Sequence, residues 1–180
     1  MIRGIILVVD DIDGFLKEGI LADKKNMVVV PETRKLLRRK ISEGWEVIFL
    51  CDSHKEGDPE LQIFEDHCMA GTKEAKVVDE LFEFVTPENY IPKPGHDGFY
   101  GTNLEEIIKQ KNPEKIVVVG VCTDVCVLYT IIGLRNIKLP NPDCQVIVPK
   151  DCVRAFDVAN TDVWFAHMKN VLDVQVVKKQ

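Results

Sequence analysis

The stretch that most constrains the fold of this chain is residues 116–130, which read IVVVGVCTDVCVLYT. Its first four residues are apolar and β-branched and run up to Gly120, a pattern typical of a strand buried on both faces of a parallel sheet. The apolar pattern that follows predicts a packed helix, with Thr123 or Asp124 as its cap. We therefore expect Cys126 in the first turn of a helix, just beyond the carboxyl end of a central strand.

This position suggests a functional role for Cys126. Open α/β sheets carry their sites at the carboxyl ends of the strands. The start of a helix also favours a negative charge, which lowers the pKa of a thiol and populates the thiolate. A reactive nucleophile at Cys126 is one interpretation. A buried structural cysteine is the other, since free cysteines are among the most buried residues.

Strand-like and helix-like segments alternate along the rest of the chain. Helical patterns follow Pro31, cover residues 74–84, begin after Thr102 or Asn103, and cover residues 158–169. With no linker and no internal repeat, residues 1–180 are predicted to form one domain, an α/β sandwich around a mostly parallel sheet of six strands. The other five expected strands are residues 2–10, 45–50, 90–93, 145–148 and 171–177.

Composition narrows the class of partner. The net charge is −6, from 23 basic and 29 acidic residues, which argues against nucleic acid or an anionic membrane as the main partner. No apolar run approaches the length of a membrane span, and the sequence MIRGIILVVD lacks the cleavage site of a signal peptide. The six cysteines are not tightly spaced, so a reducing cytoplasm is expected.

Residues 51–72 carry a candidate metal site at the end of the second predicted strand. Asp52 and His54 are two residues apart, which places both side chains on one side of an extended segment. His67 can fold back to complete the set, and Glu60 lies between the two histidines. A carboxylate with two imidazoles suits a divalent metal such as Zn²⁺. A polar surface loop with two unremarkable histidines is the alternative.

Two further charged residues adjoin predicted strands. Asp10 ends the first strand, where a carboxylate suits a site, although an aspartate there is also a common turn former. Lys93 precedes Pro94 and is expected in extended geometry. A lysine at such a position is ordinarily a solvated charge. Phe15, five residues after Asp10, is ordinarily a core residue.

Three stretches together resemble the isochorismatase-like cysteine hydrolase superfamily. They are Val9-Asp10 with Phe15; Lys93 with Phe99-x-Gly101-Thr102-x-Leu104; and GVCTDVCV over residues 120–127. The resemblance implies a three-layer, Rossmann-type sandwich whose six-stranded sheet has helices on both faces. It also implies a catalytic triad of Asp10, Lys93 and Cys126, a cis peptide bond between Val121 and Cys122, and an oxyanion hole at Cys122 and Cys126. Members of this family often self-associate, so a homo-oligomer is possible.

The segment after the second strand resembles the metal-binding segment of nicotinamidases. Asp52-x-His54, Glu60, Phe64 and His67-Cys68 match it, which implies a Zn²⁺ or similar ion held by Asp52, His54 and His67, with Glu60 as a further ligand in some members. Phe15, Phe64 and Phe99 are then expected to pack against the substrate ring. One departure concerns the first strand. The family commonly has Asp-x-Gln-x-Asp-Phe there, whereas Ile12 and Gly14 replace the Gln and the second Asp here.

The expected activity is hydrolysis of the C–N bond of a small amide through a thioester. Nicotinamide is the first candidate substrate, with nicotinate and ammonia as products and a place in NAD salvage. An N-carbamoyl or ureido compound is the alternative, which Ile12 and Gly14 leave open. Isochorismate hydrolysis is less expected, because that reaction needs no cysteine nucleophile. A non-enzymatic zinc or thiol redox module at Cys122 and Cys126 is a third hypothesis, on a weak spacing signal.

Overall fold

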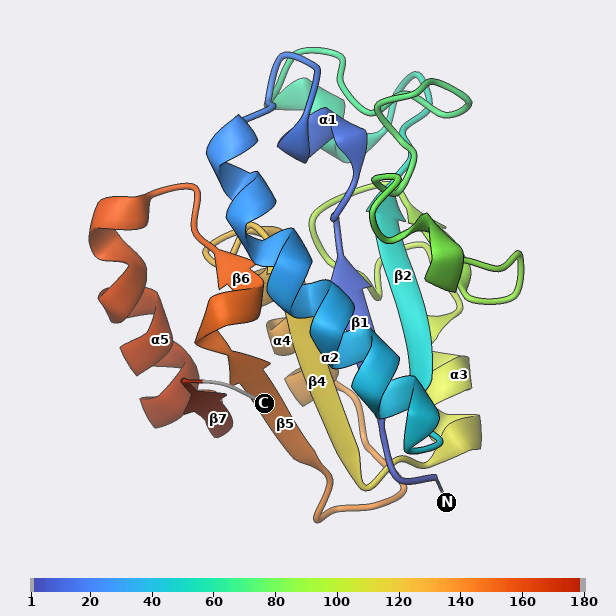
Figure 1. The fold of residues 1–180 in the computed structure, drawn as a ribbon, viewed down its shortest axis with the longest axis vertical. Helices are drawn as coiled ribbons and strands as arrows, with labels where there is room; N and C mark the ends of the chain where they lie inside the picture. Colours follow the sequence, from blue (N-terminus) through green and yellow to red (C-terminus); the bar gives the residue numbers. More distant parts are fainter. Residues whose placement is uncertain (1, 179–180) are drawn as a thin grey trace.

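A parallel sheet forms the centre of the molecule in the computed structural model, which describes residues 2–178 (Figure 1). The strand order is β3-β2-β1-β4-β5-β7, and the short β6 pairs with the end of β4. Every described pairing of strands is parallel. The strands are β1 Ile5–Val9, β2 Glu46–Asp52, β3 Tyr90–Lys93, β4 Lys115–Val121, β5 Gln145–Pro149, β6 Val153–Arg154 and β7 Val174–Val177.

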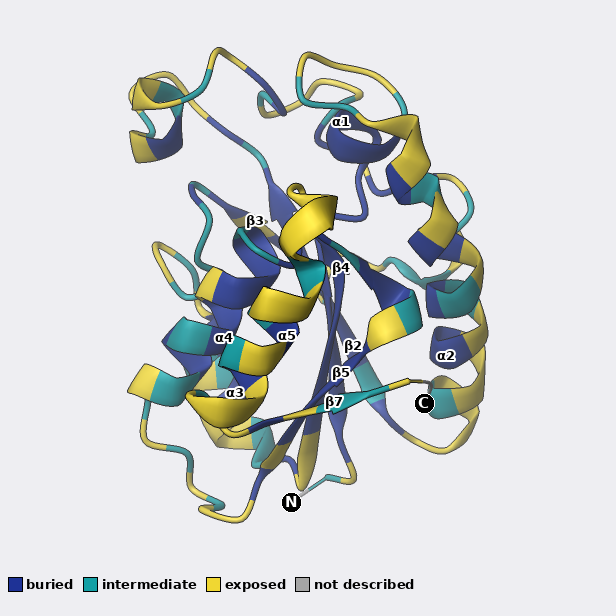
Figure 2. Cartoon of the chain, turned by 90° about the vertical axis from the view of Figure 1, so that its left-hand side faces the viewer, coloured by how far each residue is buried: buried dark blue, intermediate teal, exposed yellow. Residues whose placement is uncertain are grey.

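Helices cover both faces of this sheet, so the predicted three-layer fold is confirmed. Figure 2 shows the sheet edge-on, with α2 on one side and α3, α4 and α5 on the other. The α-helices are α1 Asp13–Leu16, α2 Val30–Ser42, α3 Leu104–Lys111, α4 Cys126–Asn136 and α5 Thr161–Asn170. Five short 3₁₀ helices complete the description: η1 Lys24–Val29, η2 Pro59–Gln62, η3 Phe82–Phe84, η4 Lys150–Cys152 and η5 Val158–Asn160.

The alternation of side chains along β1 divides the core into two layers. Leu7 and Val9 face the layer under α3, α4 and α5, whereas Ile6 and Val8 face the layer under α2. All four are fully buried. Successive side chains of a strand point to opposite faces, and a strand covered on both faces is therefore apolar throughout. This is why the continuous apolar runs in the sequence indicated central strands.

The predicted helix over residues 74–84 is wrong. Only η3, Phe82–Phe84, is helical there, and the rest of the segment consists of turns and a bend around an antiparallel bridge between Val77 and Ile12. The backbone of the segment instead bonds to the chain after β1: Asp13 N–H donates to Lys76 O, and Val78 N–H donates to Asp11 O. Backbone groups paired with a distant segment are not available for a helix, although Val78 is still buried as its apolar pattern indicated.

The strand count also differs from the prediction, because β6 was not expected. It has only two residues, too few for an apolar pattern to show. Gly120 of β4 pairs with Val153, so β6 lies beside the carboxyl end of the central strand.

Gly120 allows β1 and β4 to approach closely. Its φ is +113°, and a Cβ atom at this position would lie 1.9 Å from the carbonyl oxygen of Val9. The end of β1, which leads into Asp10, therefore adjoins the end of β4, which leads into α4. None of the helices in residues 2–178 is long and apolar enough to cross a membrane.

Candidate active site

Asp10, Lys93 and Cys126 meet at the carboxyl edge of the sheet, although they are far apart in the sequence. Asp10 follows β1, Lys93 ends β3 and Cys126 begins α4 directly after the turn from β4. The Oδ2 atom of Asp10 lies 2.8 Å from Lys93 Nζ. A carboxylate oxygen of Asp10 also lies within 4.8 Å of Cys126 Sγ. The three residues therefore share one buried volume.

Lys93 is fully buried and bonded on several sides. Its ammonium group forms ion pairs with Asp10 and Asp52 and donates a hydrogen bond to Gly95 O at 3.1 Å. Burial on its own lowers the pKa of this amine, but the two carboxylates outweigh burial and raise the pKa well above its ordinary value. Lys93 thus stays charged, and it is not the solvated lysine that its residue type ordinarily indicates.

Asp10 is positioned by the neighbouring strand β2. Its backbone N–H donates to Leu50 O at 2.9 Å, and its Oδ1 accepts from the N–H of Asp52 at 2.8 Å. Burial raises the pKa of Asp10 to about 7; the Asp52 carboxylate adds to this rise, and Lys93 opposes it. A carboxylate with a pKa near neutrality can both accept and return a proton.

The expected lowering of the Cys126 pKa is not found. Burial raises the pKa of this thiol well above its ordinary value, while Lys93 acts in the opposite direction. The cavity already holds the carboxylates of Asp10 and Asp52 against the single charge of Lys93. A thiolate would add a second uncompensated negative charge, and the start of α4 does not offset that cost.

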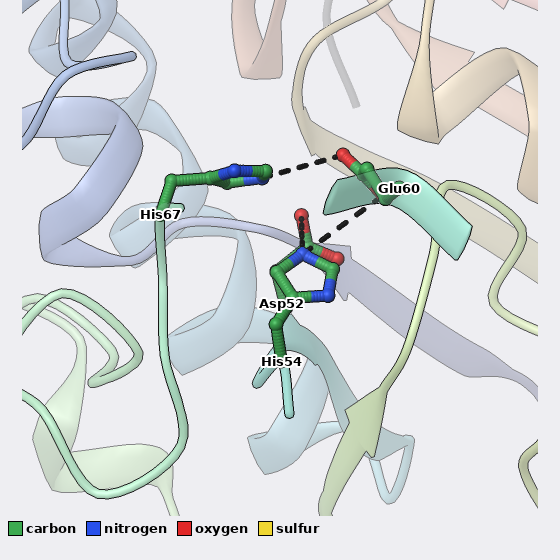
Figure 3. Close-up of side chains that lie close together, drawn as sticks. All are labelled: Asp52, His54, Glu60 and His67. Carbon is green, nitrogen blue, oxygen red and sulfur yellow. Dashed lines mark ion pairs between the residues drawn. The ribbon is translucent and has the colours of Figure 1, made fainter. Parts of the chain in front are cut away.

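The four candidate metal ligands converge beside this group, as Figure 3 shows. One donor atom from each of Asp52, His54, Glu60 and His67 lies within 4.8 Å of the others, and none of the four side chains is more than 4% exposed. The shortest contacts join His67 Nε2 to Glu60 Oε1 at 3.5 Å and His54 Nε2 to Asp52 Oδ2 at 3.6 Å.

These residues fit a divalent cation. Asp52 Oδ2, His54 Nε2, Glu60 Oε2 and His67 Nε2 are all buried without a hydrogen-bond partner. Buried polar atoms without partners are costly, and a cation among them would satisfy all four. Burial on its own raises the pKa of Glu60, but contacts with His67 and His96 outweigh it and hold the pKa below its usual range.

A pocket of about 140 Å³ opens beside Cys126. Phe15 and Phe64 line it, as expected for the substrate pocket, and Cys122 and Phe156 form other parts of its wall. Phe99 is not among the lining residues. Phe99 packs against the core layer under α4 instead. Its ring lies close to Gly133, where an added Cβ atom would be 2.7 Å from the ring.

The family model of the isochorismatase domain matches residues 4–177. This chain belongs to the isochorismatase family. As a family member it is a hydrolase of the amidohydrolase-like kind, and its parallel sheet with helices on both faces is the family fold.

Individual relatives differ in their activities. Nicotinamidase 1 of Arabidopsis thaliana is 30% identical over 172 residues, which cover 85% of this chain and 70% of that protein. The N-carbamoylsarcosine amidase of Thermoplasma acidophilum has a TM-score of 0.85 at 28% identity, covering 98% of this chain and 96% of that one. The pyrazinamidase of Pyrococcus horikoshii, solved with zinc, has a TM-score of 0.81 at 21% identity over 97% of this chain and 98% of that one.

The turn between β4 and α4 has the geometry that the family resemblance implied. The peptide bond between Val121 and Cys122 is cis. Neither predicted cap of α4 acts as one, because the capping position is Val125 and no side chain caps the helix. Asp124 instead accepts hydrogen bonds from the N–H groups of Phe156 and Asp157, at 2.7 and 2.8 Å. These two hydrogen bonds hold the backbone at Phe156, which lines the pocket, next to the turn between β4 and α4.

Sequence reasoning missed His96, which lies between the candidate metal ligands and the nucleophile. Its Nδ1 is 3.0 Å from Glu60 Oε1 and 4.0 Å from Cys126 Sγ. Its loop position among Pro and Gly residues gave no indication of a site. The one available signal was its spacing, three residues after Lys93.

Proposed function

We propose that this protein is a metal-dependent cysteine amidase that hydrolyses nicotinamide to nicotinate and ammonia. The observation that carries the proposal is the shared buried volume of Asp10, Lys93 and Cys126 next to an aromatic-lined pocket. The orphaned donor atoms at the candidate metal site support the metal dependence.

In the first half of the reaction, Cys126 Sγ attacks the amide carbon while Asp10 accepts the thiol proton. The backbone N–H groups of Cys122 and Cys126 hold the oxygen on which negative charge develops. Because burial raises the pKa of the Cys126 thiol, transfer of its proton to Asp10 accompanies the attack, and the negative charge of the carboxylate passes to the substrate oxygen. Asp10 then protonates the amide nitrogen, the C–N bond breaks, and ammonia leaves a thioester on Cys126.

In the second half, Asp10 removes a proton from a water molecule that attacks the thioester carbon. The C–S bond breaks, the acid product leaves, and the proton returns to Cys126. Lys93 holds the Asp10 carboxylate in place throughout, at 2.8 Å. Asp52, His54, Glu60 and His67 would hold a divalent ion such as Zn²⁺, which would supply a Lewis acid for the ring nitrogen of the substrate.

The charge of the pocket supports a neutral substrate. Among the described residues that line it, Asp23 and Glu60 are acidic and none is Lys or Arg. Lys93, which lies beside Cys126 below the pocket, is already paired with two carboxylates. Once Glu60 binds the cation, Asp23 remains as the acidic side chain of the lining, and it disfavours the carboxylates that N-carbamoylsarcosine, ureidoacrylate and isochorismate carry. Nicotinamide is uncharged, and its ring suits Phe15 and Phe64.

The relatives divide between the two candidate substrates. Nicotinamidase 1 of Arabidopsis thaliana is similar over most of the chain, and the similar pyrazinamidase of Pyrococcus horikoshii was solved with zinc. The similarity to an N-carbamoylsarcosine amidase favours the ureido alternative. All six cysteines are free, which agrees with a reducing cytoplasm, where the product would enter NAD salvage.

The deciding experiment measures ammonia release from nicotinamide and N-carbamoylsarcosine by metal-loaded protein of known metal content. We expect turnover of nicotinamide and a loss of about a thousandfold or more in kcat for Cys126→Ala. Cys144→Ala is the matched control, because Cys144 is a buried cysteine outside the pocket lining. Turnover of N-carbamoylsarcosine in preference to nicotinamide would contradict the substrate assignment and leave the cysteine mechanism intact.

A further inference from the structure

The His96 side chain has no part in the mechanism above, yet it contacts both halves of the site. One ring nitrogen, Nδ1, lies 3.0 Å from Glu60 Oε1 and 4.0 Å from Cys126 Sγ. His96 is not one of the four residues whose donor atoms converge on the candidate metal position. It therefore lies directly behind a metal ligand, on the side toward the nucleophile.

The direction of this nitrogen is fixed by packing. The imidazole lies against Phe64 and Tyr129, with ring centroids 5.9 and 5.4 Å away, and the side chain is 19% exposed. The loop that carries it is anchored on both sides. Lys93 Nζ donates to Gly95 O, and the N–H of Gly98 donates to Thr130 Oγ1, both at 3.1 Å.

Glu60 is the metal ligand candidate that most needs such support. Asp52 lies at the end of β2, and the backbone of His54 is bonded to Cys68 and Ala70. Glu60 instead lies on η2, a 3₁₀ helix of four residues between loops. A carboxylate on a short loop helix has many positions open to it unless its oxygens are held.

Metal binding would remove two of the three contacts that hold this carboxylate. The imidazole nitrogens within 4.0 Å of Glu60 belong to His54, His67 and His96. A cation would occupy the Nε2 atoms of His54 and His67, so these nitrogens would no longer face Glu60. Of these three imidazoles, His96 is then the one whose nitrogen still holds Glu60 Oε1.

We propose that His96 is a positioning residue that holds Glu60 as the fourth ligand of the bound cation. Because the same nitrogen also adjoins Cys126, His96 fixes the place of the cation relative to the nucleophile. The inference rests on the metal site of the proposed function. Residues that orient metal ligands in this way contribute about 10–100-fold to metal affinity.

The test measures the Kd for Zn²⁺ by competition with a chromophoric chelator, without substrate, so that its result does not depend on nicotinamide turnover. We expect His96→Phe to weaken Zn²⁺ binding by about 10–100-fold. His96→Asn should restore most of the affinity, because its amide nitrogen occupies nearly the place of Nδ1. His167→Phe is the matched control, since His167 lies on α5 and should have no effect.

A double-mutant cycle distinguishes positioning of Glu60 from general loosening of the site. In a Glu60→Ala background, His96→Phe should change the Kd by less than about twofold, because the contact is already lost. An unchanged Kd in a folded His96→Phe protein would overturn the inference and leave the metal site standing. His96→Ala repeats the test if His96→Phe does not fold. Wild-type protein that binds no Zn²⁺ would overturn both the inference and the metal dependence.

Discussion

Lys93 is the one lysine or arginine that residues 2–178 bury completely, and its charge balances two buried carboxylates. Lys93→Met keeps the length of the side chain and removes the charge. We expect the free energy of unfolding to fall by about 3–5 kcal/mol, because Asp10 and Asp52 are left without their cation. Urea unfolding measures this loss, and kcat should fall with it.

Lys35→Met is the control for this prediction, since the Lys35 side chain is 68% exposed and pairs only at the surface. Its effect on stability should stay within about 0.5 kcal/mol. An equal effect of the two substitutions would mean that the buried ion pairs contribute nothing particular to stability.

Asp11 presents the opposite case, a buried carboxyl that forms no ion pair among the described residues. Both of its oxygens are buried without a hydrogen-bond partner. Burial raises the pKa of Asp11 to about 8, and the neighbouring Asp10 charge adds to the rise. The folded state therefore holds a proton that the unfolded chain releases near pH 4. The stability that this proton confers is complete below pH 4 and is lost as the pH rises toward 8.

Asp11→Asn should remove this dependence on pH. We expect the stability of the variant relative to wild type to increase by about 1 kcal/mol per pH unit between pH 5 and pH 8. Urea unfolding at several pH values measures the difference, and the exposed Asp173→Asn is the control. Parallel pH profiles for wild type and Asp11→Asn would show that Asp11 is ionised in the fold.

At the scale of elements, the close approach of β1 and β4 at Gly120 sets the distance between Asp10 and Cys126. A methyl group at Gly120 would meet the Val9 carbonyl oxygen at 1.9 Å. Gly120→Ala should therefore cost more than about 3 kcal/mol of unfolding free energy. Gly44→Ala is the matched control, because Gly44 also has a positive φ but nothing lies within 4 Å of the added atom. It should cost about 1 kcal/mol.

Activity provides a second measurement for this pair of variants. Where Gly120→Ala still folds, β1 and β4 must move apart, and kcat should fall much more than KM rises. Gly44→Ala should leave both parameters near the wild-type values. Normal kcat in Gly120→Ala would show that the site tolerates a change in strand spacing.

The elements that sequence reasoning found are those whose pattern depends on burial alone. The apolar runs of β1, β2 and β4 indicated strands, because a strand that is covered on both faces must be apolar along its whole length. The helix predicted over residues 74–84 was wrong because the backbone of residues 74–78 bonds to residues 11–14, a pairing that no local pattern encodes. Asp124 was misassigned for a similar reason: its partners, Phe156 and Asp157, lie more than 30 residues away.

The candidate site shows the same division. Spacing and family resemblance indicated the metal group and the triad, and the structure brings both sets together. The raised pKa of Cys126 was not predictable from its position in a helix, because it depends first on how deeply the fold buries the thiol and then on the charges beside it. His96 was missed because the role of a loop histidine depends on Glu60, which another loop supplies.

At the scale of the whole molecule, the candidate metal site connects the sheet to the loop that carries η2 and His67. Asp52 belongs to β2, whereas Glu60 and His67 come from the long connection between β2 and β3. Without a cation, at least one buried donor atom from each of the four candidate ligands lacks a hydrogen-bond partner. A cation that binds the folded chain and not the unfolded chain stabilises the fold by mass action.

We therefore expect Zn²⁺ at about 100 times its Kd to add about 2.7 kcal/mol to the free energy of unfolding, and a chelator to remove that gain. Thermal unfolding with and without Zn²⁺ measures the shift, and hydrogen exchange should show slower opening of the β2–β3 connection in particular. His54→Ala should abolish the metal-dependent shift, whereas His167→Ala should retain it. An equal shift in His54→Ala would place the bound ion elsewhere. His54 Nε2 lies within 4.0 Å of both Asp52 and Glu60, so an ion at the candidate site would need it as a ligand.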